Sequence, residues 1–207
     1  MTSLAAHLPM SSVDQSWYLT INRFARATPW LHEAFRLFAV YGVALFALLL
    51  LGSWWLARGH RDADRMAASL WAPLGTLLAV GVNQPLGRWV GERRPYDALH
   101  HVLVLVPHTT DFSFPSDHAV MAGAVAAGVL LAHRQLAHRW LVLLTAVLAL
   151  LMAFARVYVG AHYPFDVIAG LVVGALVTVI GWVVVRHPLR LVVQALCRTR
   201  LRPLLVG

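Results

Sequence analysis

Long stretches of apolar residues with almost no charge are the feature that most constrains the fold of this chain. The sequence has 207 residues, of which 59% are hydrophobic and only 13% are charged, about half the charged fraction of a soluble domain. Several stretches exceed about 18 residues, the length at which an apolar segment becomes a candidate transmembrane helix. A soluble helical protein with a very apolar core would not need runs of this length. The sequence therefore predicts an all-α membrane protein with one compact helical domain.

Five apolar segments are interpreted as transmembrane helices, and they cover residues 37–56, 66–86, 119–132, 140–155 and 167–185. Ahead of them, residues 11–28 mix aromatic and aliphatic side chains with Arg23 and Arg26, which is typical of an amphipathic helix lying on the membrane surface. We expect a polytopic helical bundle with about five transmembrane helices plus an N-terminal interfacial helix. The predicted division is an N-terminal interfacial segment (1–36), a transmembrane core (37–186) and a basic cytoplasmic tail (187–207).

The chain is strongly basic, with a formal net charge of +8, and all 17 of its basic residues are arginine. In a soluble protein such a charge would suggest a nucleic-acid partner. Here the arginines gather at the ends of the apolar segments, where anionic lipid headgroups are the nearer partner. We therefore expect membrane lipids, and no nucleic acid, as partners.

Five spans divide the arginines unequally between the two membrane surfaces. One surface receives Arg58, Arg61, Arg65, Arg134, Arg139, Arg186, Arg190, Arg198, Arg200 and Arg202. The other receives Arg23, Arg26, Arg36, Arg88, Arg93, Arg94 and Arg156. Because cytoplasmic loops carry the excess of positive charge, the first surface is predicted to be cytoplasmic.

Three polar clusters lie at the ends of apolar segments, all on the predicted extracytoplasmic side. They are residues 88–95, which include three arginines, residues 114–118 and residues 156–166. In a chain this apolar, ionisable residues at the membrane edge are candidates for function. Two spans separate the second cluster from the third, which returns the chain to the same surface. We therefore expect the three clusters to meet in one site.

The residue types in these clusters are those that handle phosphate. Arginine forks match phosphate oxygens and stay charged, and histidine can act as a nucleophile or a general acid near neutral pH. An aspartate such as Asp166, four residues after His162, can fix the imidazole tautomer through one ring nitrogen. Ser116 stands where a helix opens, and free backbone N–H groups there favour an anion. The set predicts phosphoryl transfer through a covalent phosphohistidine, with no metal and no other cofactor.

The order and spacing of these residues resemble the type 2 phosphatidic acid phosphatase (PAP2) superfamily of membrane lipid phosphatases. Its three motifs are Lys-x6-Arg-Pro, Pro-Ser-Gly-His and Ser-Arg-x5-His-x3-Asp. In this chain the first ends in Arg94-Pro95 and the second is Pro115-Ser116-Asp117-His118. The third runs from Ala155-Arg156 through His162 to Asp166. The resemblance covers roughly residues 80–170, and three ordered motifs are a specific signal where any one would be weak.

The resemblance implies a role for each matching residue. His162 is expected to be the nucleophile, Asp166 the group that orients it, and His118 the acid that protonates the leaving oxygen. The residues expected to hold the substrate phosphate are Arg94, Arg156 and Ser116. The implied reaction is independent of metal.

Three positions depart from the family pattern. The family lysine falls at Gly87, and Arg88 one residue later is the candidate to replace its charge, with Gln84 a weaker one. Asp117 takes the place of the glycine in the second motif, and we expect its carboxylate to lie in the phosphate-binding region, either turned away or paired with an arginine such as Arg93. Ala155 takes the place of the serine in the third motif.

The Pro-Ser-Asp-His sequence and the short chain resemble the bacterial undecaprenyl-diphosphatase branch of the superfamily. This resemblance implies a multi-pass protein of the bacterial cytoplasmic (inner) membrane that hydrolyses a polyprenyl diphosphate to the monophosphate on the extracytoplasmic side. A phosphatidate or phosphatidylglycerol-phosphate phosphatase with the same chemistry is the alternative. A non-catalytic lipid-binding or transport protein is a third hypothesis, supported only by the missing lysine.

Overall fold

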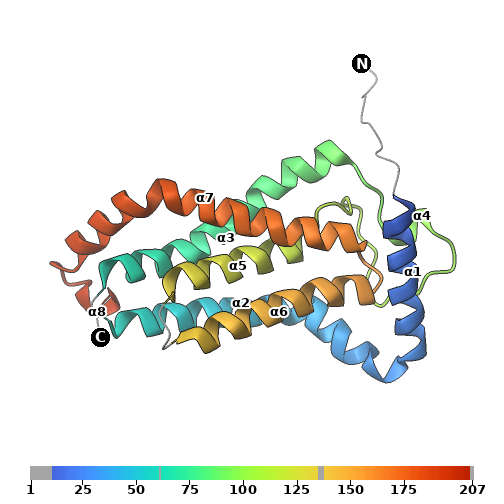
Figure 1. The fold of residues 1–207 in the computed structure, drawn as a ribbon, viewed down its shortest axis with the longest axis horizontal. Helices are drawn as coiled ribbons and strands as arrows, with labels where there is room; N and C mark the ends of the chain where they lie inside the picture. The colour runs from blue at the N-terminus through green and yellow to red at the C-terminus, as the bar shows by residue number, and fades with distance from the viewer. Residues whose placement is uncertain (1–10, 61, 135–137, 206–207) are drawn as a thin grey trace, which may run out of the picture.

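Helices form all the regular structure in the part of the chain that the computed structural model describes, residues 11–60, 62–134 and 138–205. Four helical segments are long and apolar enough to cross a membrane (Figure 1). They contain α2 (His32–Arg58), preceded by the short helix η1 (Pro29–Leu31), and also α3 (Ala63–Val90), α6 (Arg139–Tyr158) and α7 (Pro164–Leu196). The fifth predicted span forms α5 (Asp117–Ala132), a shorter apolar helix.

The short helix α5 lies at the centre of the bundle and packs against α3, α6 and α7. Most of its residues are buried, because its apolar side chains cover every face and leave no polar stripe for solvent. Glycines let its backbone approach that of α7: a Cβ at Gly123 would meet Leu171, and one at Gly174 would meet the Val120 carbonyl oxygen. Gly170, where a Cβ would meet Ala119 and the Ser116 carbonyl oxygen, lies in the same close contact between α7 and α5.

Two helices extend beyond the predicted membrane spans. Helix α2 begins at His32, inside the segment assigned to the N-terminal interfacial region. Helix α7 continues to Leu196 through Pro188, whereas the tail was predicted to begin at residue 187. A proline removes one backbone hydrogen bond but does not end a helix whose neighbours hold it in place. Residues 1–10 of the predicted N-terminal segment and 206–207 of the tail lie outside the described residues.

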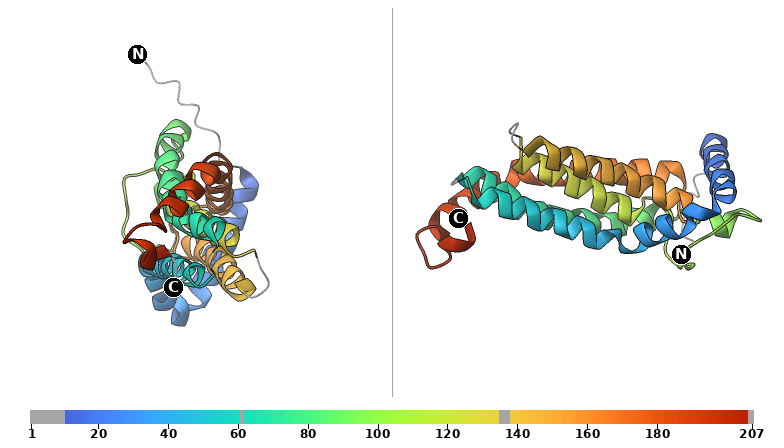
Figure 2. Two further views of the ribbon diagram at one scale, coloured as in Figure 1. Left: turned by 90° about the vertical axis from the view of Figure 1, so that its left-hand side faces the viewer. Right: turned by 90° about the horizontal axis from the view of Figure 1, so that it is seen from below.

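Helix α1 (Ser12–Ala27) crosses one end of the bundle at a steep angle to the long helices (Figures 1 and 2). Its first turn is capped by the Ser11 hydroxyl, which accepts from the Asp14 N–H at 3.1 Å. The Asn22 side chain exchanges two hydrogen bonds with the backbone of Leu103, at 2.8 and 3.0 Å. This helix therefore holds the long loop between α3 and α5 against the bundle.

The connectivity fixes which ends of the helices meet. Helix α3 ends, and α5 and α7 begin, at the end of the bundle that α1 covers (Figure 1). The short helix α4 (Pro95–Ala98) lies in the loop at this end. At the opposite end lie the start of α3, the end of α5 and the C-terminal helix α8 (Arg202–Leu205).

Candidate active site

The three polar clusters meet at the end of the bundle beneath α1. Arg94 from the first cluster contacts His162 from the third, with Nη1 and Nε2 3.2 Å apart. The Ser116 N–H from the second cluster donates to the Asp166 carbonyl oxygen at 3.1 Å. These contacts join residues that are 68 and 50 positions apart in the sequence. The two spans between the second and third clusters return the chain to the same end of the bundle, as expected.

His162 lies in the short turn between α6 and α7, and its contacts fix one neutral tautomer. Its Nδ1 lies 2.9 Å from the Ser113 carbonyl oxygen, which can only accept, so Nδ1 carries the hydrogen. Its Nε2 faces the Arg94 guanidinium, which can only donate, so Nε2 presents its lone pair. The nitrogen with the lone pair is the one that can attack an electrophile.

The surroundings of His162 keep the imidazole uncharged. The side chain is 2% exposed, and burial lowers its pKa well below the ordinary value because an apolar environment disfavours the charged form. The nearby charges of Arg156 and Arg94 lower the pKa further. A neutral imidazole is the nucleophilic form, so His162 is ready to react across the neutral pH range.

Ser113 is the site residue that the sequence analysis missed. Its side chain is fully buried, its carbonyl accepts from His162, and its hydroxyl donates to Asp166 Oδ2 at 2.5 Å. Its own N–H donates to the Glu92 carbonyl oxygen at 2.8 Å, which ties it to the end of α3. The available signal was a lone polar residue between two phenylalanines just before the second motif.

Asp166 stands beside His162 in the first turn of α7. Its Oδ2 lies 3.5 Å from His162 Nδ1, beyond the usual hydrogen-bond length, while the same oxygen accepts from the Tyr163 N–H at 2.8 Å. The Ser113 carbonyl is thus the primary partner of Nδ1, and the Asp166 carboxylate supplies a negative charge next to it. A negative charge in this place favours the imidazolium-like state that forms during phosphoryl transfer.

Arg94 is 5% exposed and uses its whole fork at the site. Nη1 donates to the Ala161 carbonyl at 3.1 Å, while Nε and Nη2 bind the carbonyl and carboxylate of Asp111 at 3.1 and 3.0 Å. Burial raises the pKa of Asp111, but hydrogen bonds from Thr109 and the charge of Arg94 outweigh it and lower that pKa. Asp111 is 59% exposed on its side chain, so a phosphate can take its place on the fork.

Arg156 and Ser116 carry unused donors in the same region. Arg156 is 8% exposed, its Nη1 donates to the Ala39 carbonyl at 3.4 Å, and its Nε has no partner among the described residues. Ser116, the N-cap of α5, is fully buried, and its hydroxyl has no partner within the described residues. Buried donors of this kind need an acceptor, and phosphate oxygens are suitable acceptors.

His118 lies in the first turn of α5, near the charged side chains of Arg156 and Arg94 and near the imidazole of His162. It also lines a cavity of about 470 Å³ between α2, α3 and α5, whose other walls are almost wholly apolar, as with Phe46 and Leu77. The imidazole thus stands between the polar site and an apolar cavity.

Arg88 and Asp117 line a second cavity of about 360 Å³ next to the site. Arg88 is exposed, and its Nε donates to the Gln84 carbonyl at 3.2 Å. Asp117 Oδ1 accepts from the side-chain amides of Asn83 and Gln84 at 2.7 and 3.0 Å. Pairing with Arg93, one of the two alternatives expected for Asp117, is not seen, since Arg93 donates to the Asp97 carbonyl at 2.7 Å. The side-chain amides of Asn83 and Gln84 are the partners of the Asp117 carboxylate instead.

Within residues 11–60, 62–134 and 138–205, no three His, Cys, Asp or Glu side chains converge in a way that could hold a metal ion.

A bundle of membrane-length helices with a histidine and arginine site at one end defines a class, the multi-pass membrane proteins that act on phosphate groups. The sequence pattern of the PAP2 superfamily matches residues 68–189, more than half of the chain. The chain belongs to the PAP2 superfamily, which confirms the resemblance seen in the three motifs.

Individual relatives agree with this membership. The undecaprenyl-diphosphatase BcrC of Bacillus subtilis is 33% identical over 137 residues, which cover 66% of each chain, slightly under two thirds of the relative. Aquifex aeolicus LpxE has a similar fold, with a TM-score of 0.62 at 24% identity over 84% of this chain and 96% of that one. The transmembrane PAP2-type phosphatidylglycerolphosphate phosphatase of Bacillus subtilis gives 0.61 at 24% identity, covering 85% and 87%. The chain is thus an integral multi-pass membrane protein.

Proposed function

We propose that this protein hydrolyses a polyprenyl diphosphate, such as undecaprenyl diphosphate, to the monophosphate and inorganic phosphate through a phosphohistidine on His162. The observation that carries the proposal is the neutral His162 imidazole, with Nδ1–H held by a backbone carbonyl and the Nε2 lone pair facing Arg94. This is the arrangement that a nitrogen nucleophile needs beside a phosphate-binding fork.

In the first step, His162 Nε2 attacks the terminal phosphorus, and the bond from that phosphorus to the bridging oxygen breaks. His118 gives its proton to the bridging oxygen, which leaves as the polyprenyl monophosphate. Arg94, Arg156 and the Ser116 hydroxyl bind the oxygens of the transferring group, where negative charge spreads in the transition state. The Asp166 carboxylate stabilises the positive charge that develops on the imidazole of His162.

In the second step, a water molecule attacks the phosphorus of the phosphohistidine. His118, now neutral, takes a proton from that water, and the bond between phosphorus and Nε2 breaks. The products are inorganic phosphate and the neutral His162 that began the cycle. Protein side chains supply the nucleophile, the acid and base, and the phosphate ligands of both steps, and the proposed reaction is independent of metal.

The apolar cavity beside His118 supports a substrate with a long hydrocarbon chain. Its walls come from α2, α3 and α5, so a prenyl chain held there keeps its headgroup next to the catalytic histidines. The undecaprenyl-diphosphatase name of the 33% identical relative favours a polyprenyl diphosphate. The phosphatidylglycerolphosphate phosphatase among the similar structures favours a glycerolipid such as phosphatidate or phosphatidylglycerol phosphate as the alternative.

We propose that the cavity lined by Arg88 and Asp117 holds the second phosphate of the diphosphate, the one that stays on the prenyl chain. Arg88 supplies a cation one position after Gly87, where the family has lysine. Asp117, with its carboxylate held by two amides, fixes the first turn of α5 next to that phosphate.

We further propose how the protein sits in a bacterial cytoplasmic membrane. Helix α5, about 24 Å long at 1.5 Å per residue, is the fifth transmembrane helix, since its neighbours enclose it and it need not match the lipid thickness alone. Helix α1 lies in the interface, as its steep angle to the bundle suggests (Figure 2). The excess of arginines at the far end of the bundle supports an extracytoplasmic active site.

The test is phosphate release by the purified protein in detergent with EDTA, from undecaprenyl diphosphate, phosphatidate and phosphatidylglycerol phosphate. We expect the prenyl diphosphate to react fastest, and His162→Ala to slow it by about 10⁴-fold or more. A faster glycerolipid would keep the mechanism and change the substrate. Release that survives His162→Ala, or no release from any lipid, would overturn the proposed mechanism and favour a non-catalytic lipid-binding role.

A further inference from the structure

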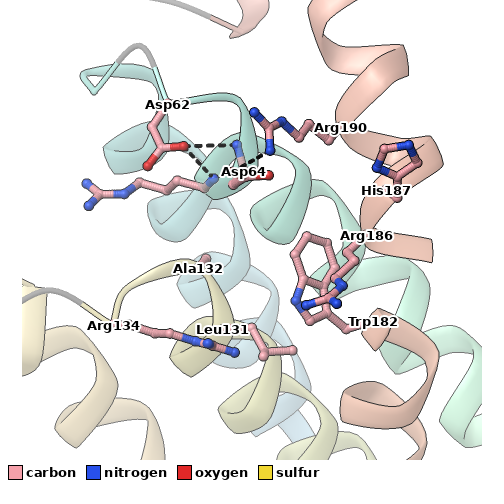
Figure 3. A pocket seen from close by; sticks show the side chains of 10 residues that line it. Asp62, Asp64, Leu131, Ala132, Arg134, Trp182, Arg186, His187 and Arg190 are labelled. Carbon is pink, nitrogen blue, oxygen red and sulfur yellow. Dashed lines mark hydrogen bonds and ion pairs between the residues drawn. The ribbon is translucent and has the colours of Figure 1, made fainter. Parts of the chain in front are cut away.

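A cavity of about 680 Å³ lies at the end of the bundle opposite the active site (Figure 3). It is formed where α3 begins, α5 ends and α7 passes by. Side chains from all three segments line it, including Arg65 from α3, Arg134 after α5 and Arg186 and Arg190 from α7. The inference drawn from it does not depend on the proposed function.

The net charge of this cavity is positive because four arginines outnumber its two aspartates, and both aspartates already have partners. Asp64 Oδ2 pairs with Arg190 Nη1 at 3.3 Å. Asp62 caps the start of α3, where its Oδ1 accepts from the N–H groups of Asp64 and Arg65 at 2.9 and 3.2 Å. The guanidinium groups of Arg65, Arg134 and Arg186 therefore remain without a paired carboxylate in the described part of the chain.

Arg65 is the strongest sign that the cavity has a ligand. It is 5% exposed, and its Nη1 has no hydrogen-bond partner among the described residues. A buried cation without a counter-charge is destabilising unless something neutralises it. Arg134 and Arg186 line the same cavity and are exposed, so an anion can reach it from outside.

The position of the cavity along α7 indicates the kind of anion. Trp182 forms one wall, and the next residues, Val183 and Val184, are 60% and 72% exposed, as expected of side chains that face lipid. Tryptophan and arginine side by side at the end of an apolar surface are typical of the headgroup level of a bilayer. Arginine forks match the oxygens of a phosphate group.

We propose that this cavity binds a phosphate-bearing anion at the membrane surface opposite the active site, with Arg65, Arg134 and Arg186 as its ligands. The phosphate comes either from the headgroup of an anionic lipid or from soluble inorganic phosphate, which share this chemistry. A lipid bound here ties α3 to α7 at the end of the bundle where no catalytic residue lies.

The lipid arm of the test uses the full chain in neutral detergent, with native mass spectrometry to measure the binding of phosphatidylglycerol and phosphatidylcholine. We expect an Arg134→Gln/Arg186→Gln double variant to bind phosphatidylglycerol about tenfold or more weaker, with phosphatidylcholine unaffected. Arg200→Gln, an exposed arginine of the C-terminal tail outside the cavity, is the matched control and should behave as wild type.

The second arm measures thermal stabilisation of the same proteins by inorganic phosphate, with the active site intact in all of them. A loss of phosphate stabilisation in the double variant alone would assign the site to soluble phosphate, and a loss of lipid binding alone to a headgroup. If the double variant matches Arg200→Gln in both arms, the proposal is overturned. Arg65→Gln is measured in the same two arms and should show the same loss as the double variant. If Arg65→Gln does not fold, the double variant still decides the question.

Discussion

The two ends of the helical bundle both gather arginines, but they hold them in different ways. At the active-site end, Arg94 and Arg156 are 5% and 8% exposed, and backbone carbonyls fix their guanidinium groups beside a neutral histidine. At the other end, Arg134 and Arg186 are exposed, and Arg65 is the buried arginine among the described residues. Fixed donors can stabilise a transition state without reorganising, whereas mobile ones can only attract an anion. We therefore expect catalysis to depend on the fixed arginines and on the His162 imidazole, and not on positive charge alone.

Among the arginines, the largest expected effect comes from replacing one whose guanidinium is fixed. We expect Arg94→Lys to lower kcat/KM about a hundredfold to a thousandfold, because lysine keeps the charge but loses the planar fork that binds two oxygens. The matched change at the other end, Arg186→Lys, should leave kcat/KM in detergent within about twofold, since it touches no reacting group. Equal losses in both variants would show that bulk charge, and not fixed geometry, drives catalysis.

Arg88 tests whether an exposed arginine can also serve the chemistry. If it replaces the family lysine, Arg88→Ala should slow turnover about a hundredfold through the loss of its contact with the remaining phosphate of the diphosphate, where charge develops as the bridging bond breaks. Steady-state kinetics on the prenyl diphosphate measure this directly. Unchanged turnover would remove Arg88 from the site and leave the phosphate to Arg94 and Arg156.

Ser113 is the residue whose effect should be intermediate. Ser113→Ala keeps the backbone carbonyl that holds His162 but deletes the hydroxyl bond to Asp166. We expect kcat to fall about tenfold with KM little changed, because the ground-state binding groups remain while the carboxylate moves relative to the imidazole. Ser113→Thr, which keeps a hydroxyl, should recover part of the loss. A change in KM alone would mean that Ser113 acts on substrate binding.

The smallest expected effect concerns the attachment of α1 over the site. Asp14 accepts from the Phe165 N–H at 3.0 Å, and burial, partly offset by this bond, raises its pKa from 3.8 to about 6. Because the folded-state pKa is the higher one, ionisation of Asp14 opposes folding as pH rises through about 6. Asp14→Asn should therefore unfold at a higher temperature than wild type at pH 8, and the gain should shrink toward pH 4. A gain that is equal at both pH values would contradict this.

The sequence predicted the site through side chains and missed what the backbone does. His162, Asp166, Arg94 and His118 were found because the family motifs name them in order. The main partner of His162 Nδ1 is a carbonyl oxygen of Ser113, and a carbonyl carries no residue identity that a motif could show. The amides that hold Asp117 come from a different helix, and only the folded structure brings them close.

The fold was predicted for similar reasons and with similar gaps. Apolar run length indicated the long helices, because hydrocarbon thickness sets a minimum length. The span predicted over residues 167–185 is shorter than α7, because the helix continues through Pro188 to Leu196, beyond the apolar run. The burial of Arg65 was equally hidden, because an arginine at the start of a helix usually extends to the surface.

The central claim is that His162 Nε2 forms the covalent bond to phosphorus. The most direct measurement is rapid acid-free quenching of the protein during turnover of polyprenyl diphosphate labelled with ³²P on its terminal phosphate, followed by peptide mapping. We predict an acid-labile, base-stable label on His162, attached at Nε2 and absent from His162→Ala. A label on His118, a label on Nδ1, or turnover without any trapped phosphohistidine would contradict the account.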